Sequence, residues 1–395
     1  MTEQAIKDKT AIAGIGWTAF TRNSGVTTLS LAAEASLKAI ADAGLTPKEI
    51  DGVVSYFHKR PETQDVKDLV RGLGLDNCNF QFFSDGGGGW NCGAVLSAAM
   101  LVHAGICKNV LVFKALNRYS AGRGARAARA NDVVGVDQFT TPFGQSHAAV
   151  SFGPYATAHM ARYGTTTLDF AHLAVTERQH ALLNTKAMMR PKGPITIEDH
   201  QNSRWIVYPF RLLDCCQESD GAVALVVTST EHARDLKHAP VTIMSGVGGP
   251  ARHTHYDDTN AARSAPLLYE GAGITPRDVS LAEIYDPFTF MCMTHIEDFG
   301  LVKKGEIGPW IREGHNRLDG DLPVNTHGGL LSEAHIHGLN HFIEAVQQLR
   351  PEGVIDDLCD GPHTYDRGVC RQVRNPEIAL VCGECGDSAM LLRRG

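Results

Sequence analysis

The chain has 395 residues, of which 43% are hydrophobic and 21% charged, a balance typical of soluble globular proteins. Its net charge of −7 and pI of about 6.2 argue against nucleic acid or an anionic membrane as its main partner. No run of about 18 apolar residues and no signal-peptide core is present, so we expect a cytoplasmic protein without a membrane anchor. In that reducing compartment we expect most of the ten cysteines to be core residues, not disulfides.

The first predicted elements alternate between strands and helices. A β-branched run predicts a strand at Thr10–Ile15, and helical spacing of apolar residues predicts a helix at Ser30–Ala43. A second strand is predicted at Gly52–Tyr56. A glycine turn then leads into a small-residue helix over Gly86–Gly105, and an apolar strand follows at Asn109–Ala115. Such alternation is typical of mostly parallel sheets with helices on both faces.

Parts of this pattern recur later in the chain. Ala43–Glu49 reads AGLTPKE and Ala272–Asp278 reads AGITPRD, and the second copy is also followed by a predicted strand, Leu281–Tyr285. Gly328–Leu349 is the counterpart of the first glycine turn and helix, and Glu377–Gly383 of the strand that follows them. Because these echoes keep their order, we predict an α/β fold duplicated into two βαβαβ halves, 1–235 and 236–395.

A long insertion interrupts the first half at about 117–213, before the predicted strand Asp220–Thr228. It contains a predicted helix at Tyr155–Tyr163. A segment of this length is too long for a structureless loop, so we expect it to fold as a cap. A smaller insertion, Leu301–Leu322, interrupts the second half.

The most informative stretch is Pro323–Gly338, which reads PVNTHGGLLSEAHIHG. It begins as a strand end, breaks at a glycine pair, and continues as an apolar stretch predicted to be helical. It holds His327, His335 and His337, and histidine is the side chain whose charge changes near neutral pH. The pattern fits an acid/base site, although a surface turn with chance histidines would also explain it.

The chain resembles the thiolase superfamily in four features. These are the duplicated halves, the DGA entry at Asp220, the NxxGG turn over Asn325–Gly329 and the position of His335. Within that superfamily, the chain is most similar to the sterol-carrier-protein-type thiolases and the bacterial steroid side-chain-cleaving aldolases. The GGGG turn, the Leu116–Arg118 stretch and the Tyr285–Phe288 stretch carry that similarity. The resemblance implies a layered αβαβα fold with an inserted cap. It also implies retro-aldol cleavage of a β-hydroxyacyl-CoA on a steroid or bile-acid side chain, releasing acetyl-CoA or propionyl-CoA with a ketone or aldehyde.

Thiolases place a nucleophilic cysteine at the first-half turn, and the aligned position here is Gly88. Cys92 lies about one helical turn further on. It is either a packing residue or, in a shifted register, the nucleophile of a thiolase or acyltransferase. Tyr285 stands where thiolases have an asparagine, and His335 stands where they have a histidine. We assign the β-hydroxyl proton to Tyr285 and stabilisation or protonation of the enolate to His335.

The remaining site residues are weaker candidates. His337 is a third catalytic candidate, although in a helix it would face away from His335. We expect five further residues to contact substrate: Gly87, Gly88, Asn325, Gly329 and Cys385. The Cys382–Cys385 pair also fits a redox site, a zinc half-site or a second catalytic base, but we expect no bound metal.

For the CoA phosphates, Arg118 and Arg123 of a basic loop are the best candidates, although a solvated loop explains them as well. CoA is expected only as part of the substrate, with no other cofactor. The resemblance further implies a homodimeric core and a small separate partner with an OB-fold and a zinc ribbon. A degenerate, non-catalytic lipid-binding protein is the alternative from another class.

Overall fold

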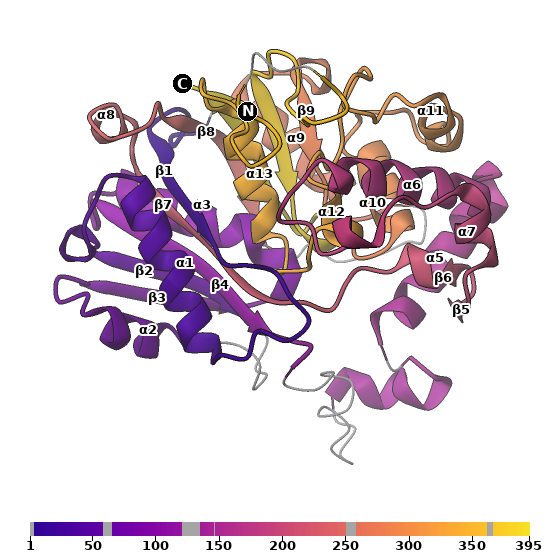
Figure 1. Ribbon diagram of the computed structural model, residues 1–395, viewed down its shortest axis with the longest axis horizontal. Coiled ribbons are helices and arrows are strands. Elements are labelled where there is room, and N and C mark those ends of the chain that lie inside the picture. The colour runs from indigo at the N-terminus through magenta and orange to yellow at the C-terminus, as the bar shows by residue number, and fades with distance from the viewer. Residues whose placement is uncertain (1–3, 58–64, 121–134, 146, 250–257, 362–365) are drawn as a thin grey trace.

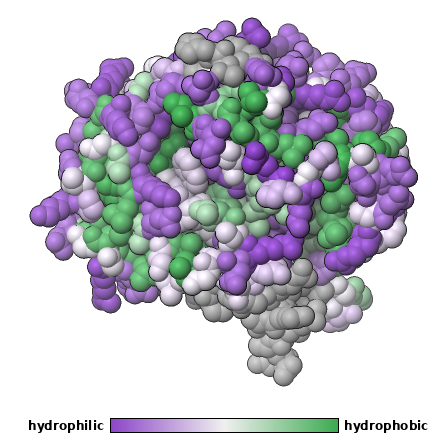
Figure 2. All heavy atoms as spheres, viewed as in Figure 1, coloured by the Kyte–Doolittle hydropathy of each residue, from purple (hydrophilic) through white to green (hydrophobic). Residues whose placement is uncertain are grey.

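The computed structural model describes residues 4–57, 65–120, 135–145, 147–249, 258–361 and 366–395. Arg123 therefore lies outside the described residues. Within them, no helix has the length and apolar character needed to cross a membrane. On the face seen in Figure 2, hydrophilic side chains surround separate hydrophobic patches.

Among the described residues, nine strands form one sheet in the order β3-β2-β4-β7-β1-β8-β11-β10-β9. The first-half strands are β1 Thr10–Trp17, β2 Gly52–Phe57, β3 Phe80–Asp85, β4 Asn109–Asn117 and β7 Asp220–Ser229. The second-half strands are β8 Val241–Gly248, β9 Leu281–Glu283, β10 Ile378–Cys382 and β11 Ser388–Arg394. Outside this sheet, β5 Trp205–Val207 and β6 Phe210–Arg211 form a small hairpin.

The strand order shows the duplication directly. Outward from the central β1–β8 pair, the order is β1, β7, β4, β2 in the first half and β8, β11, β10, β9 in the second. In each half these are the first, the last, the penultimate and the second strand along the chain. In the second half the position of the third strand is marked by a single parallel bridge between Ala282 and Val324. The halves join where β1 pairs with β8, through Ala11 with Thr242 and Ile12 with Val241.

The expectation of mostly parallel strands was wrong. Only the β2–β3, β2–β4 and β9–β10 pairs are parallel within the described sheet, whereas the other five neighbouring pairs are antiparallel. The reason is that the last strand of each half runs back against the strand before it. β10 and β11 do so through the short connection 383–387, and β4 and β7 do so after the long insertion.

The part of the sheet formed by the first-half strands and the part formed by the second-half strands, here called half-sheets, stack with three layers of helices in five layers, as expected. The outer layer on the first half holds α1 Thr28–Asp42 and α2 Val66–Leu73, and the short α8 Thr230–Ala233 follows β7. The central layer holds α3 Asn91–His103 and α13 Leu339–Leu349, and the outer layer on the second half holds α9 Ala261–Ala272 and α10 Thr289–Asp298. Because both faces of each half-sheet are covered, alternate residues of β7 enter different cores. Leu225 packs with the central layer and Val226 packs with the outer one.

The repeated TP turns have the same local structure. Thr46 and Thr275 each begin a short 3-10 turn whose third residue, Glu49 or Asp278, accepts a 2.8 Å hydrogen bond from the threonine backbone N–H. This capping box satisfies donors that would otherwise be left free at the start of the turn. Each turn is followed by the second strand of its half, β2 or β9.

The insertion folds as a cap, built from α5 Ala148–Tyr163, α6 Thr167–Leu182, α7 Ile197–Asn202 and the β5–β6 hairpin. Figure 1 shows it beside the second half of the chain, although it is inserted in the first. Its Phe210 stacks on Phe288 with ring centroids 5.0 Å apart, and Phe170 lies 6.2 Å from Phe290. Helix α6 also packs on α12 Gly329–Ser332 and on α11 Ile307–Glu313 of the smaller insertion.

One further expectation was wrong. The stretch after Gly329 is not one helix, because α12 ends at Ser332 and α13 begins only at Leu339. His337 and Gly338 between them have φ values of 48° and 78°, which a continuous helix excludes. Cys359 and Cys370 form a disulfide across the loop that separates them, and the other eight cysteines are free, so most of the cysteines are unpaired, as expected.

Candidate active site

A cavity of about 460 Å³ opens where the end of β9, the segment 334–338, the glycine turn and the cap meet. A volume of this size suits a small-molecule site. Five of the predicted site residues line it: Gly88, Arg118, Tyr285, His335 and His337. The cap contributes Arg204, Ile206, Leu212, Cys215 and Cys216, among others.

Tyr285 and His335 form the polar centre of this cavity. The Tyr285 hydroxyl lies 2.8 Å from His335 Nε2, and the two rings meet nearly edge to face. On the other side of the imidazole, Cys216 Sγ lies 3.2 Å from His335 Nδ1. The three side chains therefore form one row, in which the imidazole contacts a hydroxyl through one nitrogen and a thiol through the other.

Burial sets the protonation state of this row. It raises the pKa of the Tyr285 phenol well above the ordinary value, and it raises the pKa of the Cys216 thiol to about 12. Burial also lowers the pKa of His335 well below its ordinary value, and the Arg118 guanidinium adds to that effect. At neutral pH the row consequently holds a phenol, a neutral imidazole and a thiol, and the imidazole can act as a base.

Backbone hydrogen bonds fix Tyr285 just beyond β9. The N–H of Ile284 donates to Asn325 Oδ1 at 2.7 Å, and the N–H groups of Leu330 and Leu331 donate to Asp286 at 2.9 and 3.0 Å. Asn325, which we predicted to contact substrate, is fully buried and lies outside the cavity lining. Its place is explained by this backbone contact.

Gly329 is also behind the cavity wall. It has φ of 64°, and a Cβ there would come within 2.3 Å of Asp286 Oδ2. Glycine is required at this point because the turn passes directly against the carboxylate that holds it. Gly329 does not line the described cavity, and its substrate contact stays a prediction.

Gly88 faces the tyrosine. A Cβ built on Gly88 would lie 1.9 Å from the Tyr285 hydroxyl oxygen and 2.3 Å from its Cζ. The end of the phenol thus fills the space that a side chain at position 88 would need. Gly87 next to it is buried, has φ of 51° and does not line the cavity.

His337 points into the cavity with His335, and the prediction that it faces away was wrong. The two imidazole centroids are 5.2 Å apart, and Arg118 Nη1 lies 3.3 Å from His337 Nε2. The left-handed backbone at His337 reverses the direction that a helix would have given it. Its carbonyl accepts a 2.8 Å hydrogen bond from the Tyr56 hydroxyl, which holds this backbone in place.

The cysteine alternatives fit the structure less well. Cys92 is fully buried outside the cavity lining, its Sγ faces the Val381 carbonyl oxygen at 3.4 Å, and burial raises its thiol pKa well above the ordinary value. An inert packing cysteine has these properties. Cys385 is likewise buried, and its neighbour Glu384 lines the cavity instead. Cys382 accepts a 3.4 Å hydrogen bond from the Tyr285 backbone N–H.

Sequence reasoning missed the cap residues of the site, above all Cys216. The available signal was a Cys-Cys pair four residues before the predicted strand that begins with DGA at Asp220. A contact with a histidine 119 positions away could not be read from that pair.

Comparison with known proteins places this geometry in a family. The family description "Thiolase C-terminal domain-like" matches residues 250–357. The chain is 41% identical over 360 residues to a steroid side-chain-cleaving aldolase of Thermomonospora curvata, covering 87% of this chain and 91% of that one. It is 42% identical over 364 residues to the 17-hydroxy-3-oxo-4-pregnene-20-carboxyl-CoA lyase of Mycobacterium tuberculosis, covering 88% and 93%.

Among solved structures, the Ltp2-ChsH2(DUF35) aldolase superposes with a TM-score of 0.87 at 38% identity, covering 99% of both chains. Its sequence, like those of the two lyases, matches nearly end to end, and the layered fold agrees. The chain belongs to the thiolase-fold family of steroid side-chain-cleaving aldolases, which are carbon–carbon lyases.

Proposed function

We propose that this protein cleaves the side chain of a steroid β-hydroxyacyl-CoA by a retro-aldol reaction. The observation that carries the proposal is the placement of Tyr285 and His335, 2.8 Å apart, with the phenol filling the space beside Gly88. Acyl transfer needs a nucleophile at that point. A retro-aldol reaction instead needs a group that accepts the hydroxyl proton and one that returns a proton to carbon.

The row of neutral groups supports such a proton path. The β-hydroxyl gives its proton to Tyr285, whose own proton passes to His335 Nε2. As the Cα–Cβ bond breaks, its electron pair forms the thioester enolate and the β-carbon becomes a carbonyl. The imidazole then returns a proton to the enolate carbon, so protons and electrons balance. Cys216 at Nδ1 positions the imidazole for both transfers.

The steroid assignment rests on the names of the two lyases and on the apolar part of the cavity. Ile206, Leu212 and Phe288 line one part of it, where a fused-ring body would be buried. Arg118, together with Arg123, remains our candidate for the CoA phosphates. We keep CoA as part of the substrate and propose no further cofactor for the reaction itself.

We also propose a homodimer that forms along β3. This strand is the sheet edge, and its Phe82 and Phe83 are 37% and 48% exposed. An exposed edge with apolar side chains favours pairing with another strand. Sedimentation of the wild type and of Phe83→Lys tests this: a dimer that becomes a monomer in the variant supports it, and a monomeric wild type contradicts it.

The relative solved as Ltp2-ChsH2(DUF35) supports a small partner protein for this chain as well, for which we propose the OB-fold and zinc-ribbon type. A cytoplasmic location completes the proposal: eight cysteines are free beside the one disulfide, Cys359–Cys370, among the described residues, and a majority of free thiols suits a reducing compartment.

The decisive experiment is turnover of a synthetic steroid β-hydroxyacyl-CoA by the purified full-length chain, alone and with its co-expressed partner. The expected products are a steroid ketone or aldehyde and a shortened acyl-CoA, in equal amounts. Thiolysis that requires free CoA, or hydrolysis to free CoA, would instead indicate a thiolase or a thioesterase. Tyr285→Phe serves as the inactive control.

A further inference from the structure

A second cluster of histidines lies behind the cavity wall. Glu283 at the end of β9, His327 in the NxxGG turn and His341 in α13 place one ligand atom each within 4.8 Å of one another. All three side chains are fully buried, and none lines the cavity. We propose that these three residues bind a divalent transition-metal ion, with zinc as the preferred metal.

The donor set suits zinc. Two imidazoles and one carboxylate are a known zinc combination, and zinc prefers such borderline nitrogen and oxygen ligands. Glu283 Oε2 lies 2.8 Å from His327 Nδ1 and 3.7 Å from His341 Nδ1. Ligands at about 2.0–2.1 Å from zinc in a tetrahedron are roughly 3.3 Å apart, so small side-chain shifts would bring these three atoms to ligand positions, and a water molecule would take the fourth.

The outer contacts have the arrangement that metal-binding histidines use. His327 Nε2 faces Glu333 Oε2 at 3.6 Å, and His341 Nε2 faces Asp286 Oδ1 at 3.6 Å. Each imidazole would thus turn one nitrogen to the ion and the other to a carboxylate. Such carboxylate–histidine pairs fix the ring and increase its strength as a ligand.

The second independent observation is the absence of hydrogen bonds to these buried atoms. Both ring nitrogens of His327, both of His341 and Oε2 of Glu283 make no aligned hydrogen bond among the described residues. Nearby His180, which interacts electrostatically with Glu283 and His327, also has a buried Nε2 without a hydrogen-bond partner. The neighbouring carboxylates lie at ion-pair distance without hydrogen-bond alignment, which leaves these buried atoms poorly satisfied, and a metal ion would bind Nδ1 of both imidazoles and Oε2 of Glu283 at once.

The proposed ion would be structural. It would tie the end of β9, two residues before Tyr285, to the NxxGG turn and to α13. Because the ligands are buried away from the cavity, the ion would not touch substrate, and the proton path of the proposed reaction does not depend on it.

The rival explanation is a purely ionic cluster in which a protonated His327 balances the carboxylates. The two explanations differ in metal content. We would measure bound metals by mass spectrometry in the full-length protein, purified without chelator and then incubated with equimolar zinc. We expect about one zinc per chain, and a chelator should lower the unfolding temperature.

His327→Gln and His341→Gln keep the size and polarity of the side chain but remove a ligand. Each should weaken zinc binding more than about 100-fold, because even outer contacts change metal affinity by about 10–100-fold. His200→Gln is the matched control, since His200 is also fully buried and lies 2.8 Å from a carboxylate, Asp214. It should keep its zinc.

Wild-type protein that binds less than about 0.1 equivalents of any transition metal overturns the proposal, as does a His327→Gln/His341→Gln double variant that retains zinc. Should the variants not fold, X-ray absorption at the zinc edge of the wild type decides instead. Two imidazoles and a carboxylate around zinc support the site, and a sulfur-containing shell contradicts it.

Discussion

The Tyr285 hydroxyl oxygen lies 1.9 Å from the point where a Cβ on Gly88 would be. In the thiolase pattern that position carries the nucleophile, so this chain has a phenol at the point where a thiolase has a thiol. The two residues come from different halves of the chain and are compatible only as a pair. Their relationship leads to the first two predictions.

Tyr285→Phe should reduce kcat for side-chain cleavage by about 10²- to 10⁴-fold, because general acid–base groups contribute that much. The fold should be kept, since the change removes one hydroxyl, whose hydrogen-bond partner is His335, and leaves the ring in place. Steady-state kinetics and circular dichroism measure both. Tyr269→Phe, which removes a buried hydroxyl bonded to the Phe299 carbonyl, is the matched control and should retain its rate.

Gly88→Ala should destabilise the protein by about 1–3 kcal/mol, because the added carbon overlaps the phenol ring. The loss should shrink when Tyr285→Ala is added, since that removes the overlapping atoms. A double-mutant cycle of denaturant unfolding measures this coupling. Equal losses from Gly88→Ala in both backgrounds would contradict the contact.

Cys216→Ala should lower kcat by roughly tenfold while KM changes little, because it leaves His335 Nδ1 without its 3.2 Å neighbour. Cys216→Ser retains an acceptor for the Nδ1–H of His335 and should recover much of the rate. Cys107→Ala is the control, because its thiol is buried outside the cavity lining, beside the Asp51 carbonyl oxygen. A serine variant no faster than the alanine variant would indicate a packing role only.

The pH profile of kcat should show no acidic limb near pH 6.5, because burial keeps the pKa of His335 well below the ordinary histidine value.

The same lowered pKa of His335 should make the stability of the fold depend on pH. Below about pH 6.5 the unfolded chain takes up a proton that folded His335 refuses, so the free energy of unfolding falls with falling pH. Nuclear magnetic resonance of a ¹³C-labelled His335 ring tests the assignment, and a titration midpoint near 6.5 would refute it.

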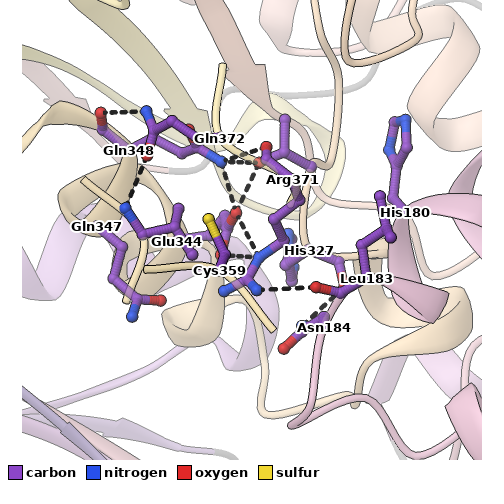
Figure 3. A network of polar contacts seen from close by, with 12 residues as sticks. His180, Leu183, Asn184, His327, Glu344, Gln347, Gln348, Cys359, Arg371 and Gln372 are labelled. Carbon is purple, nitrogen blue, oxygen red and sulfur yellow. Dashed lines mark hydrogen bonds and ion pairs between the residues drawn. The ribbon is translucent and has the colours of Figure 1, made fainter. Parts of the chain in front are cut away.

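Arg371→Met should cost about 3–5 kcal/mol of stability, because it strands the buried carboxylate of Glu344. Arg371 Nε lies 3.1 and 3.2 Å from the two Glu344 oxygens, and its Nη1 donates to the Leu183 carbonyl at 3.1 Å (Figure 3). Arg393→Met is the control, since Arg393 pairs with Asp8 at 2.9 Å but is 43% exposed. It should cost less than about 1 kcal/mol, as measured by urea unfolding.

Local sequence rules explain which parts of this structure could be predicted. The six predicted strands and the two TP turns follow from apolar runs and from capping residues three positions apart, and they appear where expected, whereas β3, β8 and β11 were not predicted. His335 was identified from the histidines beside the glycine pair, whereas Tyr285 and the roles of both residues came from the family resemblance. The direction of the His337 side chain depends on the left-handed backbone of His337 itself, which interrupts the predicted helix, and this conformation cannot be predicted from the residue type. The Cys216–His335 contact joins residues 119 positions apart, so it could be found only from the tertiary structure.

The cap belongs to the first half in sequence but packs on the second half. This packing limits how the gene could have been duplicated and where the chain can be cut into two fragments. Residues 148–210 continue the first copy in sequence, yet their aromatic face is covered by α10 of the other copy. A fragment ending near residue 235 would leave that face bare and should aggregate. The ancestral single unit must therefore have lacked the cap or dimerised to cover it, and split-gene versions of this enzyme would need their cut elsewhere.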